Sequence, residues 1–298
     1  MALPHQGELA ALATAGCWTL TALSFESAGK RVGSLAVNLI RLVMACVLLT
    51  VFGLITRGHP LPTDASPKAW LWLTLSGLVG FAFGDLCLFR AFVLLGARIA
   101  MLIMALVPPL TALIGWAFLG EQLGLRHWIG MALTVSGVIW VALERREQEP
   151  AIGPLRVGPG VLLALGAAVG QAVGLVLSKF GMASYNPFAS AQIRVLTGAI
   201  GFVVIFFAFR RWSWVGAALR DGAAMVRISI GAIFGPFLGV SFSLMAIQRT
   251  ATGVAATIMA IVPVLIIAPA VLLLHEKVSL RAVAGAVLAV VGVGMLFL

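Results

Sequence analysis

The chain has 298 residues, of which 61% are hydrophobic and only 10% are charged. A soluble domain carries roughly 25% charged residues, so this composition excludes a soluble protein and predicts that lipid surrounds most of the chain. The net charge of +10 does not indicate nucleic-acid binding, because the basic residues stand at the ends of apolar runs, where they meet lipid headgroups. The three cysteines lie inside apolar runs without metal-ligand spacing, so we expect no metal, no cofactor and no disulfide framework.

Ten stretches are apolar and about 20 residues long, the length that a membrane-spanning helix needs. Their approximate ranges are 8–27, 33–56, 68–89, 97–119, 125–143, 157–178, 187–209, 225–247, 251–274 and 280–298. The first residues, MALPHQGELA, lack a basic segment, so we expect no cleavable signal peptide. The longest hydrophilic segment, 144–156, follows the fifth stretch and divides the chain into two halves, 1–148 and 149–298. The sequence therefore predicts an all-α integral membrane protein with ten transmembrane helices, five in each half.

The two halves repeat each other. Residues 121–138 read EQLGLRHWIGMALTVSGV and residues 276–293 read EKVSLRAVAGAVLAVVGV, with eight of 18 positions identical. Upstream, AMLIMALVPPL at 100–110 matches AATIMAIVPVL at 255–265 at seven of 11 positions. Two repeats with an odd number of spans enter the membrane from opposite sides, so we expect inverted repeats with a site near the midplane between them. This architecture predicts a carrier that exposes one cavity alternately to either side.

These repeated segments resemble the EamA type of the drug/metabolite transporter superfamily. The resemblance rests on MALVPPL and MAIVPVL, on LGEQLGLRHWIGMALTVSGV and LHEKVSLRAVAGAVLAVVGV, and on Trp18, the Ser178–Lys179 pair, Arg41 and Arg194. It implies a non-enzymatic exporter of amino acids, other metabolites or toxic organic molecules in the bacterial inner membrane. In the first half the sequence departs from the family, because Phe25–Glu26 stands in place of the Ser–Lys pair.

Asp85 is an ionisable residue inside the third stretch, where a charge costs about 2.5–3.5 kcal/mol on insertion scales. Its repeat partner is Val240, so Asp85 is not part of the symmetric scaffold. One interpretation makes Asp85 a partner for a substrate ammonium group or a proton-coupling carboxylate. The other makes it a helix cap or a partner of Arg90.

Two further pairs of charged residues occupy equivalent positions in the halves. Arg41 and Arg194 each lie about eight residues into an apolar stretch. Each guanidinium either binds a substrate carboxylate with two hydrogen bonds, or turns along its helix to the headgroups or makes a structural hydrogen bond. Glu26 and Lys179 have opposite charges, so they either pair across the halves or mark helix ends.

Pro108 and Pro263 fall near the middle of the fourth and ninth stretches, where a proline removes a helical hydrogen bond and bends the helix. Uncharged polar side chains and soft apolar ones at similar depths complete the candidate site. The predicted substrate-binding residues are Trp18, Asn38, Arg41, Asp85, Met104, Pro108, Gln171, Lys179, Gln192, Arg194, Met259 and Pro263.

The segments 121–126 and 276–281 each place a glutamate shortly before a predicted helix, which favours the helix start, so we interpret both as structural turns. Glycines recur seven residues apart at 130 and 137, and at 285 and 292. They predict close packing of the fifth and tenth helices, within the bundle or in a dimer, and we expect a monomer or a weak homodimer.

The orientation of the termini stays open. Basic residues in the loops opposite the termini outnumber those on the same side as the termini, which favours termini outside the cell. The family resemblance implies termini in the cytoplasm.

The sequence contains no nucleotide-binding GxxxxGK[ST] segment, so a gradient or the substrate itself must supply the energy. We expect a secondary-active exporter of amino acids or related small metabolites that works by alternating access. Its partners would be a small-molecule substrate and membrane lipids, with proton coupling through Asp85. The alternatives are a flippase of lipid-linked substrates and a membrane enzyme, although the four histidines are dispersed and form no catalytic group.

Overall fold

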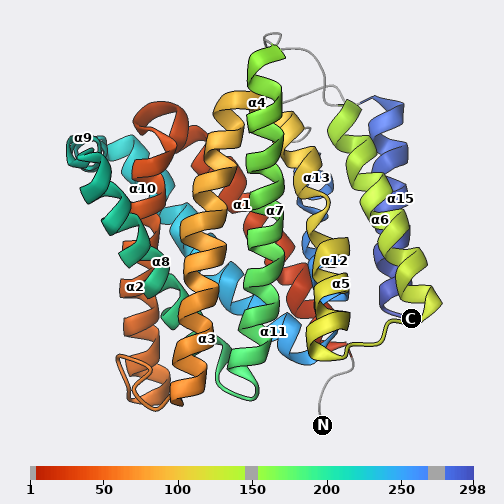
Figure 1. Ribbon diagram of the computed structural model, residues 1–298, viewed down its shortest axis with the longest axis horizontal. Coiled ribbons are helices and arrows are strands. Elements are labelled where there is room, and N and C mark those ends of the chain that lie inside the picture. The colour runs from red at the N-terminus through yellow and green to blue at the C-terminus, as the bar shows by residue number, and fades with distance from the viewer. Residues whose placement is uncertain (1–4, 145–153, 268–278) are drawn as a thin grey trace.

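The computed structural model describes residues 5–144, 154–267 and 279–298, and it folds them into a bundle of helices (Figure 1). The first half contains α1 (Gln6–Val32), α2 (Ser34–Arg57), α3 (Pro67–Gly77), the π-helix η1 (Leu78–Asp85), α4 (Leu86–Met104), α5 (Val107–Leu119) and α6 (Leu125–Glu144). The second half contains α7 (Pro154–Met182), α8 (Pro187–Phe209), α9 (Trp212–Arg220), α10 (Gly222–Ala232), the π-helix η2 (Ile233–Gly239), α11 (Val240–Arg249), α12 (Thr252–Met259), α13 (Val262–Leu265) and α15 (Leu280–Leu296). The described residues form no strand, so the all-α prediction is confirmed for them.

Within the described residues, seven helical segments are long and apolar enough to cross a membrane: Gln6–Val32, Ser34–Arg57, Pro67–Ala91, Leu125–Leu143, Gly158–Met182, Pro187–Phe209 and Gly222–Arg249. Three shorter apolar helical segments correspond to the remaining predicted spans, at Val107–Leu119, Thr252–Leu265 and Leu280–Leu296. The fourth and ninth predicted spans are thus interrupted, and part of the ninth, 268–274, lies outside the described residues. The count of ten spans stays a prediction.

The two prolines at equivalent positions explain these interruptions. Pro108 lies in the first turn of α5 and Pro263 in the first turn of α13, each directly after a short break in the helix. The first turn accepts proline well, because its N–H would have no helical partner there. The prolines therefore start new helices after a break, which interrupts the two predicted spans more completely than a bend would.

The third span of each half changes from an α-helix to a π-helix at the same place in the repeat. The starts of η1 and η2, Leu78 and Ile233, are 155 residues apart, which is the offset of the repeated segments. Pro236 inside η2 accounts for a break in the α-helical pattern, but η1 contains no proline. Short π-helical turns are rare and occur frequently at functional sites.

Helices α6 and α15, the fifth spans of the two halves, pack side by side and antiparallel (Figure 1). Gly137 lies against Gly285 and Ala289, so close that a Cβ on Gly137 would collide with their backbones. Toward the other end, Gly130 lies against Gly292 and Leu296. The predicted close packing is confirmed as a contact within the bundle.

The first span of each half packs against the third span of the other half. Helix α1 contacts α10, η2 and α11, and α7 contacts α3, η1 and α4. The hydroxyl of Thr14 donates to the carbonyl of Gly239 at 3.4 Å, and Ser76 hydrogen-bonds Ser178 at 2.7 Å. The halves are interlocked and share one core.

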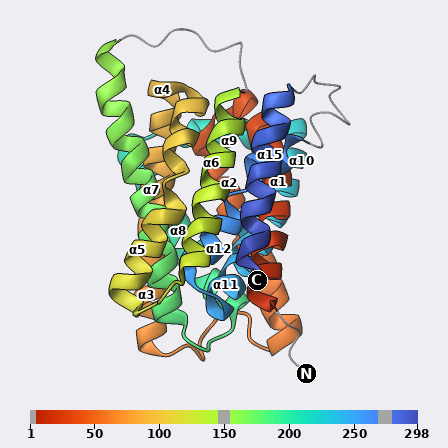
Figure 2. The ribbon, with the colours of Figure 1, turned by 90° about the vertical axis from the view of Figure 1, so that its right-hand side faces the viewer.

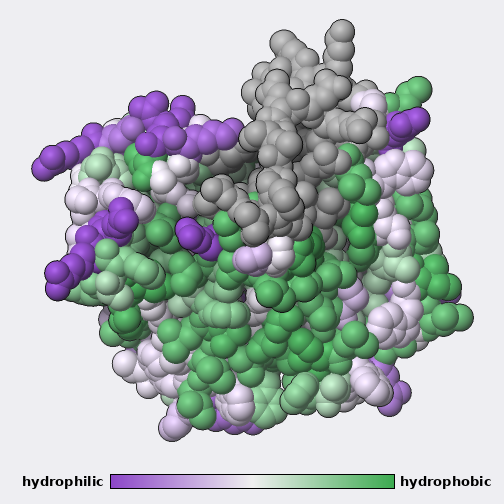
Figure 3. Space-filling model, turned by 45° about the horizontal axis from the view of Figure 1, so that its top comes forward, coloured by the Kyte–Doolittle hydropathy of each residue, from purple (hydrophilic) through white to green (hydrophobic). Residues whose placement is uncertain are grey.

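The described ends of the chain meet at one end of the bundle, where the rings of His5 and Phe297 are 5.9 Å apart. We call this the terminal end, and Figure 2 shows α1 starting and α15 finishing toward it. Figure 3 tilts the opposite end forward and shows hydrophobic side chains over the flank and hydrophilic ones near that end. Exposed apolar residues such as Ile55, 77% exposed, and Phe207, 66% exposed, fit a surface in contact with lipid.

Candidate functional site: a buried Arg–Asp–Arg cluster

Asp85 and Arg41 form an ion pair inside the bundle. Asp85 is the last residue of η1 and is 5% exposed, while Arg41 projects from α2. The Arg41 guanidinium also lies 5.3 Å from the centre of the Phe25 ring, a favourable cation–π distance. The interpretation that pairs Asp85 with Arg90 is therefore wrong, because Arg41 is its partner.

Arg194 on α8 lies close enough to Asp85 for their charges to attract each other. The residue is 3% exposed and its guanidinium lies 5.0 Å from the centre of the Phe81 ring. A Cβ built on Gly80, at the middle of the span Pro67–Ala91, would be 3.3 Å from an Arg194 Nη atom. The guanidinium thus lies beside the middle of this candidate span, far from its ends, so the interpretation that Arg194 turns to the headgroups is wrong. We call Arg41, Asp85 and Arg194 the Arg–Asp–Arg cluster.

Several buried polar atoms near these residues along α2 and α8 have no hydrogen-bond partner among the described residues. They are Asn38 Nδ2 and Oδ1, Arg41 Nε, Ser190 Oγ and Arg194 Nε. Asn38 precedes Arg41 by one helical turn, and Ser190 precedes Arg194 by one turn. Buried polar groups are rarely left unpaired, so these helices hold spare hydrogen-bonding capacity. Ser190 was not predicted, since a serine in an apolar stretch gives no signal of its own.

Lys179 forms a different contact, at the terminal end of the bundle. Its Nζ donates to Glu121 Oε1 at 2.7 Å and to the carbonyl of Thr250 at 2.7 Å. The Thr250 hydroxyl donates to Glu8 Oε1 at 2.8 Å, which places Lys179 beside the start of α1. Position 26 lies 18 residues beyond Glu8 along α1, which puts the two positions roughly 27 Å apart. The hypothesis that Glu26 pairs with Lys179 is therefore wrong.

Glu121 joins the two halves of the chain. Its Oε2 accepts hydrogen bonds from the backbone N–H of Thr252 at 2.9 Å and from the Thr252 hydroxyl at 2.7 Å. It thus caps the start of α12 in the second half, as well as preceding α6. We call Glu121, Lys179 and Thr252 the terminal-end lock. The prediction placed Glu121 in a turn of its own half and missed Thr252; the repeat counterpart Glu276 lies outside the described residues.

Gln192 holds a loop at the same end. Its Nε2 donates to the Thr50 hydroxyl at 3.0 Å and to the carbonyl of Pro60 at 2.7 Å. Both protons of this amide are therefore used within the protein, and Gln192 is not part of the Arg–Asp–Arg cluster.

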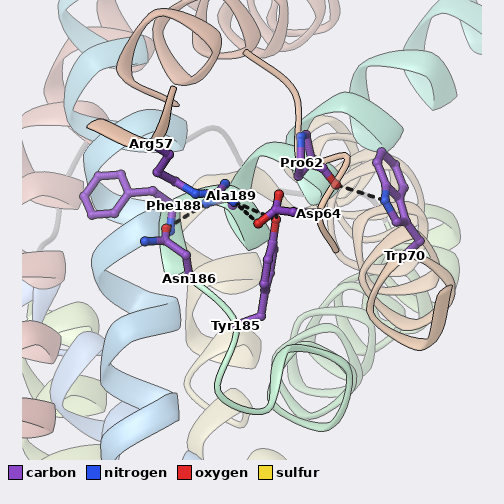
Figure 4. A network of polar contacts seen from close by, with 8 residues as sticks. All are labelled: Arg57, Pro62, Asp64, Trp70, Tyr185, Asn186, Phe188 and Ala189. Carbon is purple, nitrogen blue, oxygen red and sulfur yellow. Dashed lines mark hydrogen bonds and ion pairs between the residues drawn. The ribbon is translucent and has the colours of Figure 1, made fainter. Parts of the chain in front are cut away.

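Close by, Arg57 and Tyr185 converge on Asp64 and tie the loop after α2 to the loop before α8 (Figure 4). The Tyr185 hydroxyl donates to Asp64 at 2.8 Å. The hydrogen bond from Arg57 holds the pKa of the Asp64 carboxyl below its usual value. This network connects the halves at the terminal end, and its residues were not predicted.

The remaining predicted residues lie beside the π-helices and the helix breaks. Trp18 packs against Gly239 of η2, and the backbone of Gln171 lies beside Gly84 of η1, at the equivalent place. Met104 and Met259 each end the helix that precedes a break, and the first turns after these breaks hold Pro108 and Pro263. The structure therefore brings together Arg41, Asp85 and Arg194 from the predicted set, and distributes the others over the interface between the halves and the terminal end.

Comparison with known proteins gives the same two-part division. The model of the EamA-like transporter family matches residues 5–143 and, separately, residues 158–298. An uncharacterized transporter encoded in the cobO 3' region of Sinorhizobium sp is 31% identical over 133 residues, which cover 45% of this chain and 94% of that protein. The permease-like protein YdzE of Bacillus subtilis (strain 168) is 36% identical over 72 residues, 24% of this chain and 92% of that protein.

The fold also matches a solved crystal structure of a protein with a TM-score of 0.80 and 22% sequence identity. The match covers 98% of this chain and 96% of that one. At this identity the likeness extends to the fold alone.

Proposed function

The chain belongs to the EamA-like transporter family, and on that premise we propose that it is a secondary-active exporter of amino acids or related small metabolites. The proposal includes ten membrane spans, arranged as two inverted five-helix repeats within 1–148 and 149–298. It places the chain in the bacterial inner membrane as a monomer or a weak homodimer. Family membership itself carries the coarser statement, that this is a membrane transporter.

The observation that carries the proposal is the Arg–Asp–Arg cluster between interlocked, antiparallel halves. Arg41 and Asp85 come from the first half and Arg194 from the second. Charged groups in a membrane interior are costly and generally mark substrate or ion routes. A binding group shared by two inverted repeats is the arrangement from which alternating access operates.

The terminal-end lock supports a cycle in which the two ends open in turn. Lys179 of the second half pairs with Glu121 of the first, so this end separates only when the pair breaks. The repeat equivalents of Lys179, Glu121 and Thr252 are residues 26, 276 and 97, which are Glu, Glu and Ala. These residue types include no cation, so the equivalent positions cannot form this ion pair with one another, and we expect the two closed states to differ in stability.

Asp85 is the proposed coupling residue. Its carboxylate is held by Arg41 and attracted by Arg194. A proton on Asp85 would cancel both attractions, so protonation would release the contact between α2 and η1. Proton binding at this residue thereby links the gradient to the movement of a span.

The direct test is counterflow in proteoliposomes that contain the purified full-length chain. Vesicles are loaded with one unlabelled amino acid or metabolite, and uptake of the same radiolabelled compound is followed with and without a pH gradient. A carrier gives transient accumulation of unmodified compound above equilibrium. Chemical conversion of the compound would instead indicate an enzyme, and movement restricted to labelled lipids would indicate a flippase; either result contradicts the proposal.

A further inference from the structure

The Arg–Asp–Arg cluster is electrically unbalanced. It contains two guanidinium groups, which stay protonated in proteins, and one carboxylate. Asp85 forms its ion pair with Arg41. The Arg194 side chain has no ion pair or hydrogen bond among the described residues. Whether or not Asp85 carries a proton, the cluster keeps at least one net positive charge.

The surroundings give this charge little compensation. Arg194 is 3% exposed, so water does not solvate it freely. The Phe81 ring, with its centre 5.0 Å from the guanidinium, offers a weaker attraction than a carboxylate would. The missing side chain at position 80 lets the backbone of η1 approach the guanidinium closely, because a Cβ there would be only 3.3 Å from an Nη atom.

From this imbalance we propose that the transported molecule carries an anionic group, a carboxylate, which binds Arg194 at mid-membrane depth. A carboxylate accepts two parallel hydrogen bonds from one guanidinium, and it would neutralise the excess charge. A cation at this place would meet net repulsion, which is strong where the effective dielectric constant is low. The inference rests on the proposed transport function and narrows its substrate class to carboxylates.

Arg41 has a different role in this arrangement. Its guanidinium is already paired with Asp85, so it supports the site without being free for the substrate. Asn38, one turn away on α2, has both amide atoms buried and without a hydrogen-bond partner among the described residues. While Arg194 on α8 holds the carboxylate, the remaining part of the substrate would form hydrogen bonds with Asn38 on α2.

The test compares matched ligands on the purified full-length chain in detergent. The probes are sets of compounds that share a side chain and differ in one group: the amino acid, its carboxamide, the amine that lacks the carboxyl group, and the carboxylic acid that lacks the amine. Binding is followed by thermal stabilisation and by calorimetry. We expect at least one set in which both carboxylates bind at least about tenfold more tightly than the amide and the amine.

Variants of Arg194 locate the binding group. Arg194→Gln should abolish the preference for carboxylates, and Arg194→Lys should keep part of it, because the charge remains but the two-bond geometry is lost. Arg249→Gln, at the end of α11, is the control that should bind normally. If Arg194→Gln does not fold, the comparison of acid with amide on the unaltered chain still decides the question.

The outcomes separate this inference from the proposed function. Equal binding of acids and amides, a panel in which amines but no carboxylates bind, or unchanged carboxylate binding by Arg194→Gln overturns the inference. Counterflow of an uncharged compound without counterflow of carboxylates would also overturn it, while leaving the transport proposal intact. Carboxylate binding without any counterflow would support the site and contradict transport.

Discussion

At the scale of single residues, Asp85 and Arg41 illustrate how a buried ion pair constrains both partners. Removing one partner leaves the other charge uncompensated in the bundle, which costs about 3–5 kcal/mol. Because Asp85 is 5% exposed, water cannot replace the lost contact. The pair should therefore affect stability and transport through different routes.

We predict that Asp85→Asn abolishes transport while the chain still inserts into the membrane. The variant should also lower the thermal stability in detergent, since Arg41 loses its partner. Adding Arg41→Gln should restore part of the stability, because both charges are then gone, but it should not restore transport. Melting temperatures and counterflow of the four chains check this, and wild-type transport by Asp85→Asn would remove Asp85 from the mechanism.

Lys179 and Glu121 give a second residue-scale prediction. Hydrogen bonds to charged groups contribute roughly 1.5–3 kcal/mol, and Lys179 Nζ makes two of them. Lys179→Met should destabilise the closed terminal end and lower the melting temperature. The double variant Glu121→Lys with Lys179→Glu should recover only part of the lost melting temperature, because the Thr252 N–H loses its acceptor.

The matched control for this pair is Lys68→Met, since Lys68 is exposed and does not join the lock. Its ammonium lies 4.5 Å from the centre of the Phe180 ring, a contact worth only about 0.5–1 kcal/mol at an exposed site. The control should therefore keep the counterflow of the unaltered chain and lose less melting temperature than Lys179→Met. A Lys179→Met variant that behaves like this control in both measurements would show that the lock does not hold the terminal end closed.

At the scale of helices, the sequence predicts the spans more accurately than their interruptions. Hydrophobic runs place most spans within a few residues, because the lipid core demands a fixed apolar length. Pro108 and Pro263 signal a break, but they cannot tell a bend from a new start. The π-helix η1 has no proline, so neither composition nor periodicity indicates that Asp85 ends a wide helical turn.

The sequence also does not predict which charged residues form ion pairs. The partners Arg41 and Asp85 are 44 residues apart and Lys179 and Glu121 are 58 apart, so only the tertiary arrangement of the helices brings each pair together. The repeat predicted that Lys179 has an equivalent in Glu26, but symmetry relates positions and does not make them neighbours.

The contact between α6 and α15 yields a prediction at this scale. Gly137→Leu places a side chain against the backbone of Ala289 and Gly285, and overpacking of this kind costs about 1–3 kcal/mol or more. The variant should have a lower melting temperature and a lower yield of folded protein. Gly294→Leu on α15 is the control, because no atom lies within 4 Å of a Cβ there; equal losses in both would contradict the close contact.

At the scale of the whole molecule, the ends of the bundle differ in charge. Described basic residues at the terminal end include Arg57, Lys68, Arg126, Lys179 and Arg249, and those toward the opposite end include Lys30, Arg31, Arg90, Arg210, Arg211, Arg220, Arg227 and Arg281. At the opposite end, the Arg211 guanidinium lies 4.5 Å from the centre of the Trp214 ring at the start of α9. Tryptophan and arginine side by side fit a membrane interface.

This asymmetry predicts that the opposite end faces the cytoplasm, because basic loops are retained there. Both termini would then lie outside. A C-terminal alkaline phosphatase fusion should be active and a C-terminal green fluorescent protein fusion dark. The reverse pattern would show that the termini are cytoplasmic, as the family resemblance implies, and that the charge bias does not set the orientation of this chain.

The central claim is that one site between the halves opens to each side of the membrane in turn. The most direct test uses the variant Gly80→Cys, because residue 80 lies beside Arg194 at mid-span. The variant is made in a chain whose native cysteines are replaced, and the resulting protein must retain counterflow. A membrane-impermeant thiol reagent should modify this cysteine from either side of sealed vesicles, whereas Gln122→Cys, at the terminal end, should react from one side only. Reaction of Gly80→Cys from a single side, or from neither side while counterflow continues, would contradict alternating access through this site.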